Sequence, residues 1–244
     1  MNALADNLQS VQERITAAAR RVGRDPAEIT LVAVTKNQFQ ETIAAAFDLG
    51  LRHFGENRVE EAEDKIPALP AGITWHMIGH IQGRKAKLVV PLFHMVHSVD
   101  SARLAARLHR LCTEEGTRLP VLLQVNVSGE ESKYGIAAER WAEECDQRRD
   151  LLAAVDEIVA LPGVQVQGLM TMAPIVSDPE QVRPVFATLR HLRDELAGLY
   201  PQATWQHLSM GMSDDFEVAV EEGATLVRIG RAIFDPDQPI LCRI

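Results

Sequence analysis

Short apolar runs alternate along the whole chain with amphipathic stretches of helical period, and this alternation limits the fold more than any other feature. Strands that alternate with helices pair in parallel through right-handed crossovers. Eight parallel strands is the number that closes a barrel. The runs predict eight strands, over Thr30–Lys36, His53–Glu56, Thr74–Gly79, Met95–Val99, Val121–Val127, Val166–Thr171, Trp205–Met210 and Leu226–Gly230.

Helical patterns fill the intervals, and an amphipathic helix over Ala5–Val22 precedes the first strand. A doubly wound open sheet is the competing fold, and it would place a glycine-rich phosphate turn after the first strand. The turn Thr35–Phe39 contains no glycine. We therefore expect an α/β protein, a single-domain (β/α)8 TIM barrel over residues 1–244 with an extra N-terminal helix. The helices are expected over Gln40–Leu49, Arg58–Lys65, Gly83–Val90, Ser101–Glu115, Ala137–Ala160, Pro179–Leu199 and Asp214–Glu222.

Composition limits the kind of partner. The formal net charge of -9 argues against a nucleic-acid or anionic-membrane surface. Cys112, Cys145 and Cys242 are odd in number and widely spaced, which is typical of reduced thiols in a cytoplasmic protein. The first residues show no signal-peptide pattern, and no apolar run approaches the ~18 residues of a membrane span. We expect a cytoplasmic protein, and the absence of an obvious apolar patch favours a monomer.

Lys36 ends the first predicted strand, which is apolar from Ile29 onward. This position predicts an aliphatic stem inside the protein and an amine at the mouth of the barrel. Desolvation there disfavours the ammonium, and the neutral amine is the form that makes Schiff bases. The alternative is a lysine that extends into solvent from a strand end.

The last two predicted strands are followed by loops suited to phosphate. Leu208–Ser213 combines small residues and one glycine, so backbone amides can converge beside the hydroxyls of Ser209 and Ser213. After the eighth strand, Gly230 permits close backbone approach and Arg231 adds a positive charge. Barrels commonly bind phosphate at these two loops. The alternative for Ser213 is an ordinary helix N-cap.

An aldehyde-reactive lysine and a phosphate site in one mouth fit a ligand that carries both groups, and pyridoxal 5′-phosphate (PLP) is such a molecule. Arg228 alternates with Val227 and Ile229 on its strand, so it points away from them. If it faces the mouth, it can donate to the pyridine nitrogen and keep that nitrogen unprotonated, which disfavours carbanion chemistry. The alternative is an arginine that faces the helices in an ion pair.

His76 and His80 are four residues apart, the spacing of a helical zinc pair. Their segment is predicted to be a strand, in which four residues span roughly 13 Å, so we expect no shared metal. His80 follows the third strand and is a candidate cofactor-site residue; the alternative is a hydrogen-bonded structural histidine.

Eight ordered blocks resemble the pyridoxal phosphate homeostasis proteins, which are similar to the barrel domain of alanine racemases without its second domain. The blocks begin at Leu31, His53, Trp75, His97, Val125, Gly168, Leu208 and Val227. The resemblance implies that Lys36 carries PLP as an internal aldimine. It also implies roles for Asn57 beside the ring, for Arg228 at the pyridine nitrogen, and for Ser209, the Met210 backbone, Gly230 and Arg231 at the phosphate. The chain departs from the family pattern at Arg231, Gly83–Arg84, Tyr134 and Asp235.

Three functions follow from these residues. The first is a non-catalytic carrier that holds PLP and passes it to apo-PLP enzymes, because eight βα units leave no second domain to close over a substrate. The second is a weak PLP-dependent amino-acid racemase or lyase, with Lys36 as one base and His80 or Tyr134 as the other. The third is a cofactor-free Schiff-base aldolase that acts on a phosphorylated sugar through the same lysine.

Overall fold

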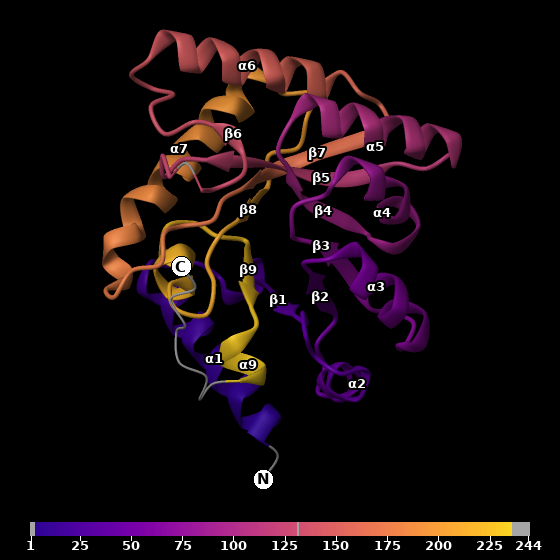
Figure 1. Cartoon of the computed structure of the whole chain (residues 1–244). Coiled ribbons are helices and arrows are strands. Elements are labelled where there is room, and N and C mark those ends of the chain that lie inside the picture. The colour runs from indigo at the N-terminus through magenta and orange to yellow at the C-terminus, as the bar shows by residue number, and fades with distance from the viewer. Residues whose placement is uncertain (1–2, 131, 236–244) are drawn as a thin grey trace.

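The computed structural model describes residues 3–130 and 132–235, and its centre is a closed parallel barrel (Figure 1). The sheet order is β4-β3-β2-β1-β9-β8-β7-β5, and pairing of β4 with β5 closes the cylinder. β6 lies outside the barrel and pairs with β5. The strands are β1 (Thr30–Val34), β2 (His53–Glu56), β3 (Thr74–Met77), β4 (Met95–Val99), β5 (Leu119–Asn126), β6 (Ile136–Ala137), β7 (Val164–Met170), β8 (His207–Ser209) and β9 (Leu226–Ile229).

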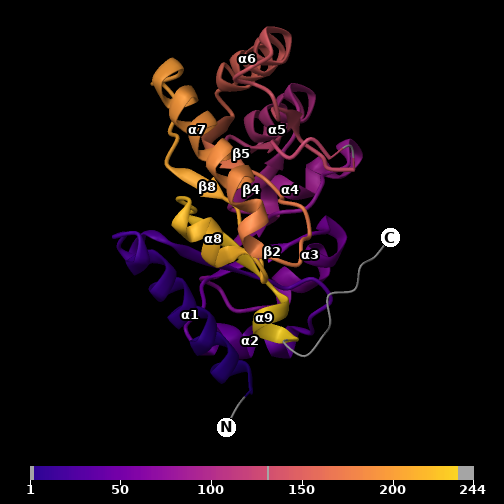
Figure 2. The same ribbon diagram turned by 90° about the vertical axis from the view of Figure 1, so that its left-hand side faces the viewer.

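Helices surround the barrel and cover its outer face (Figures 1 and 2). They are α1 (Ala3–Arg21), α2 (Gln40–Asp48), α3 (Val59–Lys65), α4 (Ala86–Leu92), α5 (Ala102–Glu114), α6 (Cys145–Val159), α7 (Arg183–Leu199), α8 (Phe216–Glu221) and α9 (Arg231–Phe234). Short 3-10 turns are η1 (Pro26–Glu28), η2 (Ile66–Ala68), η3 (Gly83–Lys85) and η4 (Pro179–Val182).

Two apolar cores follow from the alternation of strand side chains. The larger one fills the space between strands and helices, as the apolar faces of α5 and α7 require. The smaller one is a separate cluster of Val32, Leu122, Met170 and Leu226 inside the barrel. Since side chains two residues apart share a face of a strand, Arg228 points to the same side as Leu226.

The predicted barrel with its N-terminal helix is confirmed, but three local expectations are wrong. β1 ends at Val34, so Lys36 lies two residues beyond the strand and is exposed, without the buried stem that we expected. The segment Ala137–Ala160 is not one helix, because β6 ends at Ala137 and α6 begins only at Cys145, after extended backbone at Glu144. The four-residue helix α9 was missed.

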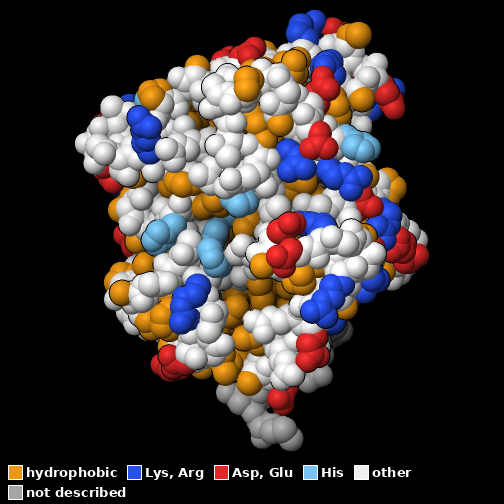
Figure 3. Space-filling view, turned by 180° about the vertical axis from the view of Figure 1, so that it is seen from behind, with side chains coloured by type: hydrophobic (Ala, Val, Ile, Leu, Met, Phe, Trp, Pro, Cys, Tyr) orange, Lys and Arg blue, Asp and Glu red, His pale blue; other side chains and the backbone are white. Residues whose placement is uncertain are grey.

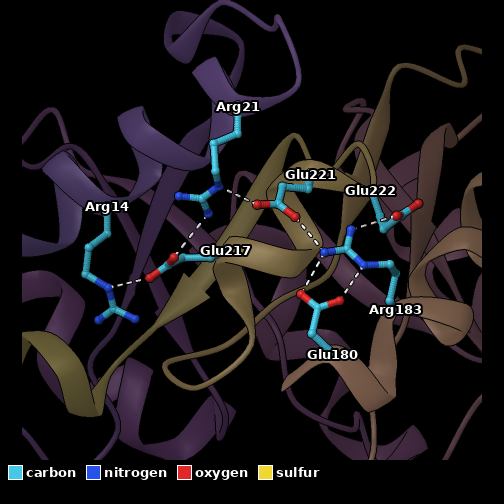
Figure 4. Close-up of polar contacts among 7 residues, drawn as sticks. All are labelled: Arg14, Arg21, Glu180, Arg183, Glu217, Glu221 and Glu222. Atoms are coloured by element: carbon cyan, nitrogen blue, oxygen red, sulfur yellow. Dashed lines mark hydrogen bonds and ion pairs between the residues drawn. The ribbon is translucent and has the colours of Figure 1, made fainter. Parts of the chain in front are cut away.

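Arginine and glutamate side chains join α1 to α8 and α7 across the surface (Figure 4). Arg14 contacts Glu217 at 2.6 Å, and Arg21 contacts Glu221 at the same distance. Arg183, the first residue of α7, also contacts Glu221 at 2.6 Å. We call this set the Arg–Glu network; its members are Arg14, Arg21, Glu180, Arg183, Glu217, Glu221 and Glu222. It links the N-terminal helix to the last βα units.

Cys112 is buried and Cys145 is exposed, and both are free thiols, whereas Cys242 lies outside the described residues. Among residues 3–130 and 132–235, none of the helices combines the length and apolarity that a membrane crossing requires.

Candidate functional site

The backbone just before Lys36 is anchored by the neighbouring strand and by α3. Thr35 Oγ1 donates to Glu56 Oε1 at 2.7 Å. Lys65 Nζ donates to the Thr35 carbonyl at 2.9 Å and to Glu56 Oε1 at 3.0 Å. Burial raises the pKa of the fully buried Glu56 carboxyl, against the opposing effects of Thr35 and Lys65. Lys36 is therefore an exposed side chain that follows an anchored stretch of backbone.

Asn57 follows β2 beside this anchored backbone and packs closely against the turn that follows β3. A Cβ atom on Gly79 would lie 2.1 Å from the Asn57 carbonyl oxygen, so only glycine permits this approach. Ser98 Oγ donates to the Gly79 carbonyl at 2.7 Å and fixes the same turn. Asn57 Oδ1 is buried and has no hydrogen-bond partner among the described residues. Since buried polar atoms are normally paired, this oxygen fits a donor supplied by a ligand.

The loop after β8 presents backbone amides at the same end of the barrel. Gly211 has a φ of +93°, and a Cβ there would meet the Ala219 Cβ at 2.6 Å. Within residues 3–130 and 132–235, the amides of Gly211, Ser213 and Arg231 make no hydrogen bond. The Met210 amide donates to the Leu226 carbonyl at 3.1 Å, so it is not free for the predicted phosphate contact.

Ser213 joins the two predicted phosphate loops. Its Oγ accepts a hydrogen bond from the Ala232 amide at 3.2 Å. It is not an N-cap, because α8 begins at Phe216. The Arg231 guanidinium is paired with the Asp214 carboxylate, so its charge is partly neutralised. Ser213 and Arg231 line a cavity of about 370 Å³ that α1 closes on its other side with Asn7 and Ser10.

Arg228 lies inside the barrel, which excludes the helix-facing alternative. It donates to Ser209 Oγ at 2.6 Å and to the Thr171 carbonyl at 2.9 Å. Burial lowers the pKa of the Arg228 guanidinium to about 10, with Asp215 opposing, so the side chain remains a protonated donor at neutral pH. The Ser209 hydroxyl is fully buried and contacts Arg228 and His97, rather than the amide loop where the sequence led us to place it.

His80 and His76 lie apart, as their strand spacing predicts. His80 is exposed at the barrel mouth, with Nδ1 3.0 Å from Asp100 Oδ2 and its ring stacked on Tyr134 at 4.1 Å. His76 is buried inside the barrel against His97.

Sequence reasoning missed Thr35, Lys65, His97 and Thr171 as contacts of this site. Strand alternation could have placed His97 inside the barrel, but nothing local identifies its partner Ser209, which is 112 residues away.

Comparisons with known proteins agree with this arrangement. The family described as alanine racemase, N-terminal domain, matches residues 2–237. The pyridoxal phosphate homeostasis protein of Aquifex aeolicus is 41% identical over 235 residues, which cover 96% of this chain and 98% of the relative. That of Escherichia coli strain K12 is 43% identical over 242 residues, which cover 96% and 97%. The chain belongs to the pyridoxal phosphate homeostasis protein family.

A solved relative carries the fold and a ligand. PipY of Synechococcus elongatus PCC7942, with PLP bound, superposes with a TM-score of 0.79 at 36% identity, over 95% of this chain and 99% of that chain. The resemblance that the eight sequence blocks indicate is therefore confirmed at the level of the pyridoxal phosphate homeostasis family.

Proposed function

We propose that this chain binds pyridoxal 5′-phosphate and serves PLP homeostasis, as a single-domain monomeric carrier that passes PLP to apo-PLP enzymes. The observation that carries the proposal is the strand order β2-β1-β9-β8. Asn57, Lys36, Gly230 with Arg231, and the Gly211 amide loop each follow one of these four adjacent strands. Because the carboxyl ends of parallel strands meet at one rim, these groups converge there.

The residues fit this cofactor one by one. PLP supplies an aldehyde that an unprotonated lysine amine attacks, and Lys36 offers an exposed amine at the rim. The free amides of the two loops and the Arg231 side chain would hold the phosphate, as amides at such loops do. Asn57 would lie beside the ring, and Arg228 would donate to the pyridine nitrogen without giving up its proton.

Two proposed contacts need a different atom from the one first expected. Met210 would contribute packing rather than its amide, because that amide donates to the Leu226 carbonyl. Ser209 would offer its hydroxyl from inside the barrel, beside Arg228, rather than from the amide loop.

The second candidate function is weak racemase or lyase activity on amino acids. It is favoured by the His80–Asp100 pair, because a carboxylate that orients a histidine is the arrangement of a general acid–base. Tyr134, stacked on the His80 ring and exposed, is the other candidate base.

Removal of the amine tests the attachment. Purified protein is expected to show a visible absorbance band with PLP, and borohydride is expected to fix the cofactor on the peptide that contains Lys36. Lys36→Ala should lose both signals and stay folded, since the residue is exposed beyond β1, whereas the exposed Lys87→Ala serves as the matched control. Attachment that survives in Lys36→Ala would refute the assignment.

Transfer separates the two functions. The carrier is expected to activate an apo-PLP enzyme and to leave alanine, serine and threonine enantiomers unchanged. Steady turnover that depends on both Lys36 and His80 would establish the enzyme instead.

A further inference from the structure

Three histidines form a hydrogen-bonded row inside the barrel that the proposed function does not use. His53 Nδ1 lies 3.0 Å from His76 Nε2, and His76 Nδ1 lies 2.9 Å from His97 Nε2. His97 Nδ1 lies 2.8 Å from Ser209 Oγ, which accepts from Arg228. The histidine row (His53, His76 and His97) therefore links β2, β3 and β4 to β8 and β9 across the interior.

The row reaches the surface at the end of the barrel opposite the proposed cofactor site. His53 is the first residue of β2 and is half-buried, whereas His76 and His97 are 2% and 0% exposed. Figure 3, which shows the molecule from behind Figure 1, shows histidine side chains gathered around a hollow. His94 and His207, beside the starts of β4 and β8, lie at this end. In the described part of the chain, no three histidine, cysteine or acidic side chains are arranged for a metal.

Arg228 fixes the direction of these hydrogen bonds. A guanidinium only donates, so Ser209 Oγ accepts there, and the buried hydroxyl proton is satisfied only when it is donated to an acceptor. Among the described residues, its remaining partner is His97 Nδ1. A neutral imidazole has one N–H. His97 therefore donates from Nε2 to His76.

The same reasoning passes along the row. His76 accepts at Nδ1, so it donates from Nε2 to His53 Nδ1, and His53 carries its proton on Nε2. Burial lowers the pKa of His76 to about 3 and that of His97 well below its usual range, so both rings are neutral at neutral pH. The three tautomers are thus set together by one arginine.

We propose that the histidine row is a two-state relay that couples PLP at Arg228 and Ser209 to His53 at the opposite end of the barrel. If the Ser209 hydroxyl donated its hydrogen bond to bound PLP, His97 Nδ1 would be left without a donor. All bonds are restored when every ring carries its proton on Nδ1: His53 then donates to His76, His76 to His97, and His97 to Ser209 Oγ. Mixed tautomers are disfavoured, because each places two lone pairs or two protons face to face.

The conversion balances without a change of charge. At each ring one N–H bond breaks at Nε2 and one forms at Nδ1. The Ser209 proton passes to His97 Nδ1, the Nε2 proton of His97 passes to His76 Nδ1, and that of His76 passes to His53 Nδ1. His53 releases its Nε2 proton to water, and another water gives Ser209 Oγ the proton that the hydroxyl then donates to the ligand. The three histidines are positioning residues for Ser209, and the coupling is reciprocal: whatever favours the Nδ1–H form of His53 favours PLP binding.

The relay rests on the proposed function, and nitrogen NMR of the intact protein tests the two separately. In histidine-¹⁵N protein without PLP, all three rings are expected in the Nε2–H form. With saturating PLP, all three should change together to Nδ1–H. His94 and His109 are internal controls, because each accepts a backbone N–H at Nδ1 and should remain Nε2–H throughout.

Ser209→Ala tests the coupling itself. Because Ser209 belongs to the cofactor site, PLP is raised until the variant shows the absorbance band of the wild-type protein. At that occupancy His53 should no longer change its tautomer. Mixed or independently changing tautomers in the wild-type protein would overturn the relay, as would a His53 change that persists in Ser209→Ala. If Ser209→Ala does not fold, the wild-type spectra alone decide. Absence of any PLP band in wild-type protein would refute the proposed function and the ligand-driven reversal, and the PLP-free spectra would still show whether the row has one common tautomer.

Discussion

The Arg–Glu network on the surface and the histidine row in the interior are both continuous lines of polar contacts, yet they differ in what each contact requires. The surface network joins full charges at 2.6–3.2 Å, and Arg183 alone has three glutamate partners. The histidine row joins neutral rings at 2.9–3.0 Å, and each ring nitrogen in these contacts has one partner. Loss of one member leaves alternatives on the surface but an unsatisfied group in the interior.

This difference separates exposed polar contacts, which add little to stability, from buried polar contacts, which stabilise the fold and set the tautomers of the histidines. Exposed ion pairs are worth little because water and salt replace them. Buried hydrogen bonds are strengthened by the low dielectric, and a lost partner has no substitute. The comparison leads to three expectations.

The largest effect is expected in the interior. His97→Leu leaves the Ser209 hydroxyl proton and His76 Nδ1 without their partner, so the free energy of unfolding should fall by about 2–5 kcal/mol. Urea denaturation measures it, with the exposed His191→Leu as control, which should change stability by about 0.5 kcal/mol or less. Equal effects of the two substitutions would show that burial does not distinguish these histidines.

A pH effect of intermediate size should follow from the same burial. The folded pKa of His76 is about 3, below the value of about 6.5 in the unfolded chain, so the unfolded state binds more protons between these limits. The stability that neutral His76 contributes is present above pH 6.5 and is lost as the pH falls towards 3.

The expected slope is up to about 1.4 kcal/mol per pH unit for this ring. The unfolding free energy of His76→Gln, measured from pH 6 to pH 4, should therefore depend less steeply on pH than that of wild type. Parallel pH profiles would mean that His76 is already protonated in the folded protein.

The smallest effect is expected on the surface. Arg183→Ala should lower the free energy of unfolding by about 1 kcal/mol or less, because the side chain is partly exposed and its contacts are screened. The difference from wild type should shrink in high salt, whereas that of His97→Leu should not. A salt-independent loss above about 2 kcal/mol would place the network among the main stabilising contacts of the fold.

Sequence pattern predicted the barrel because its signal is repeated eight times, and an error in one strand does not change the count. Lys36 and the two predicted phosphate loops were found because they follow strands, where this fold concentrates polar groups. The bounds of β1 were less certain, because Thr35 is compatible with a strand and its amide still donates to the Gly55 carbonyl. The strand ends because the Thr35 carbonyl accepts from the Gln38 amide in a turn. The function of His97 was not predictable, since its partners come from β3 and β8.

The anchored carbonyl of Thr35 has a consequence for Lys36. With the preceding peptide bound to Lys65, the amine explores only the small volume that its own side-chain torsions allow, which keeps it at high effective concentration for anything seated at the rim. The same exposure leaves that amine open to competition from amines in solution. A flexible Lys36 side chain on an anchored backbone thus favours both the attachment of a ligand at the rim and its release.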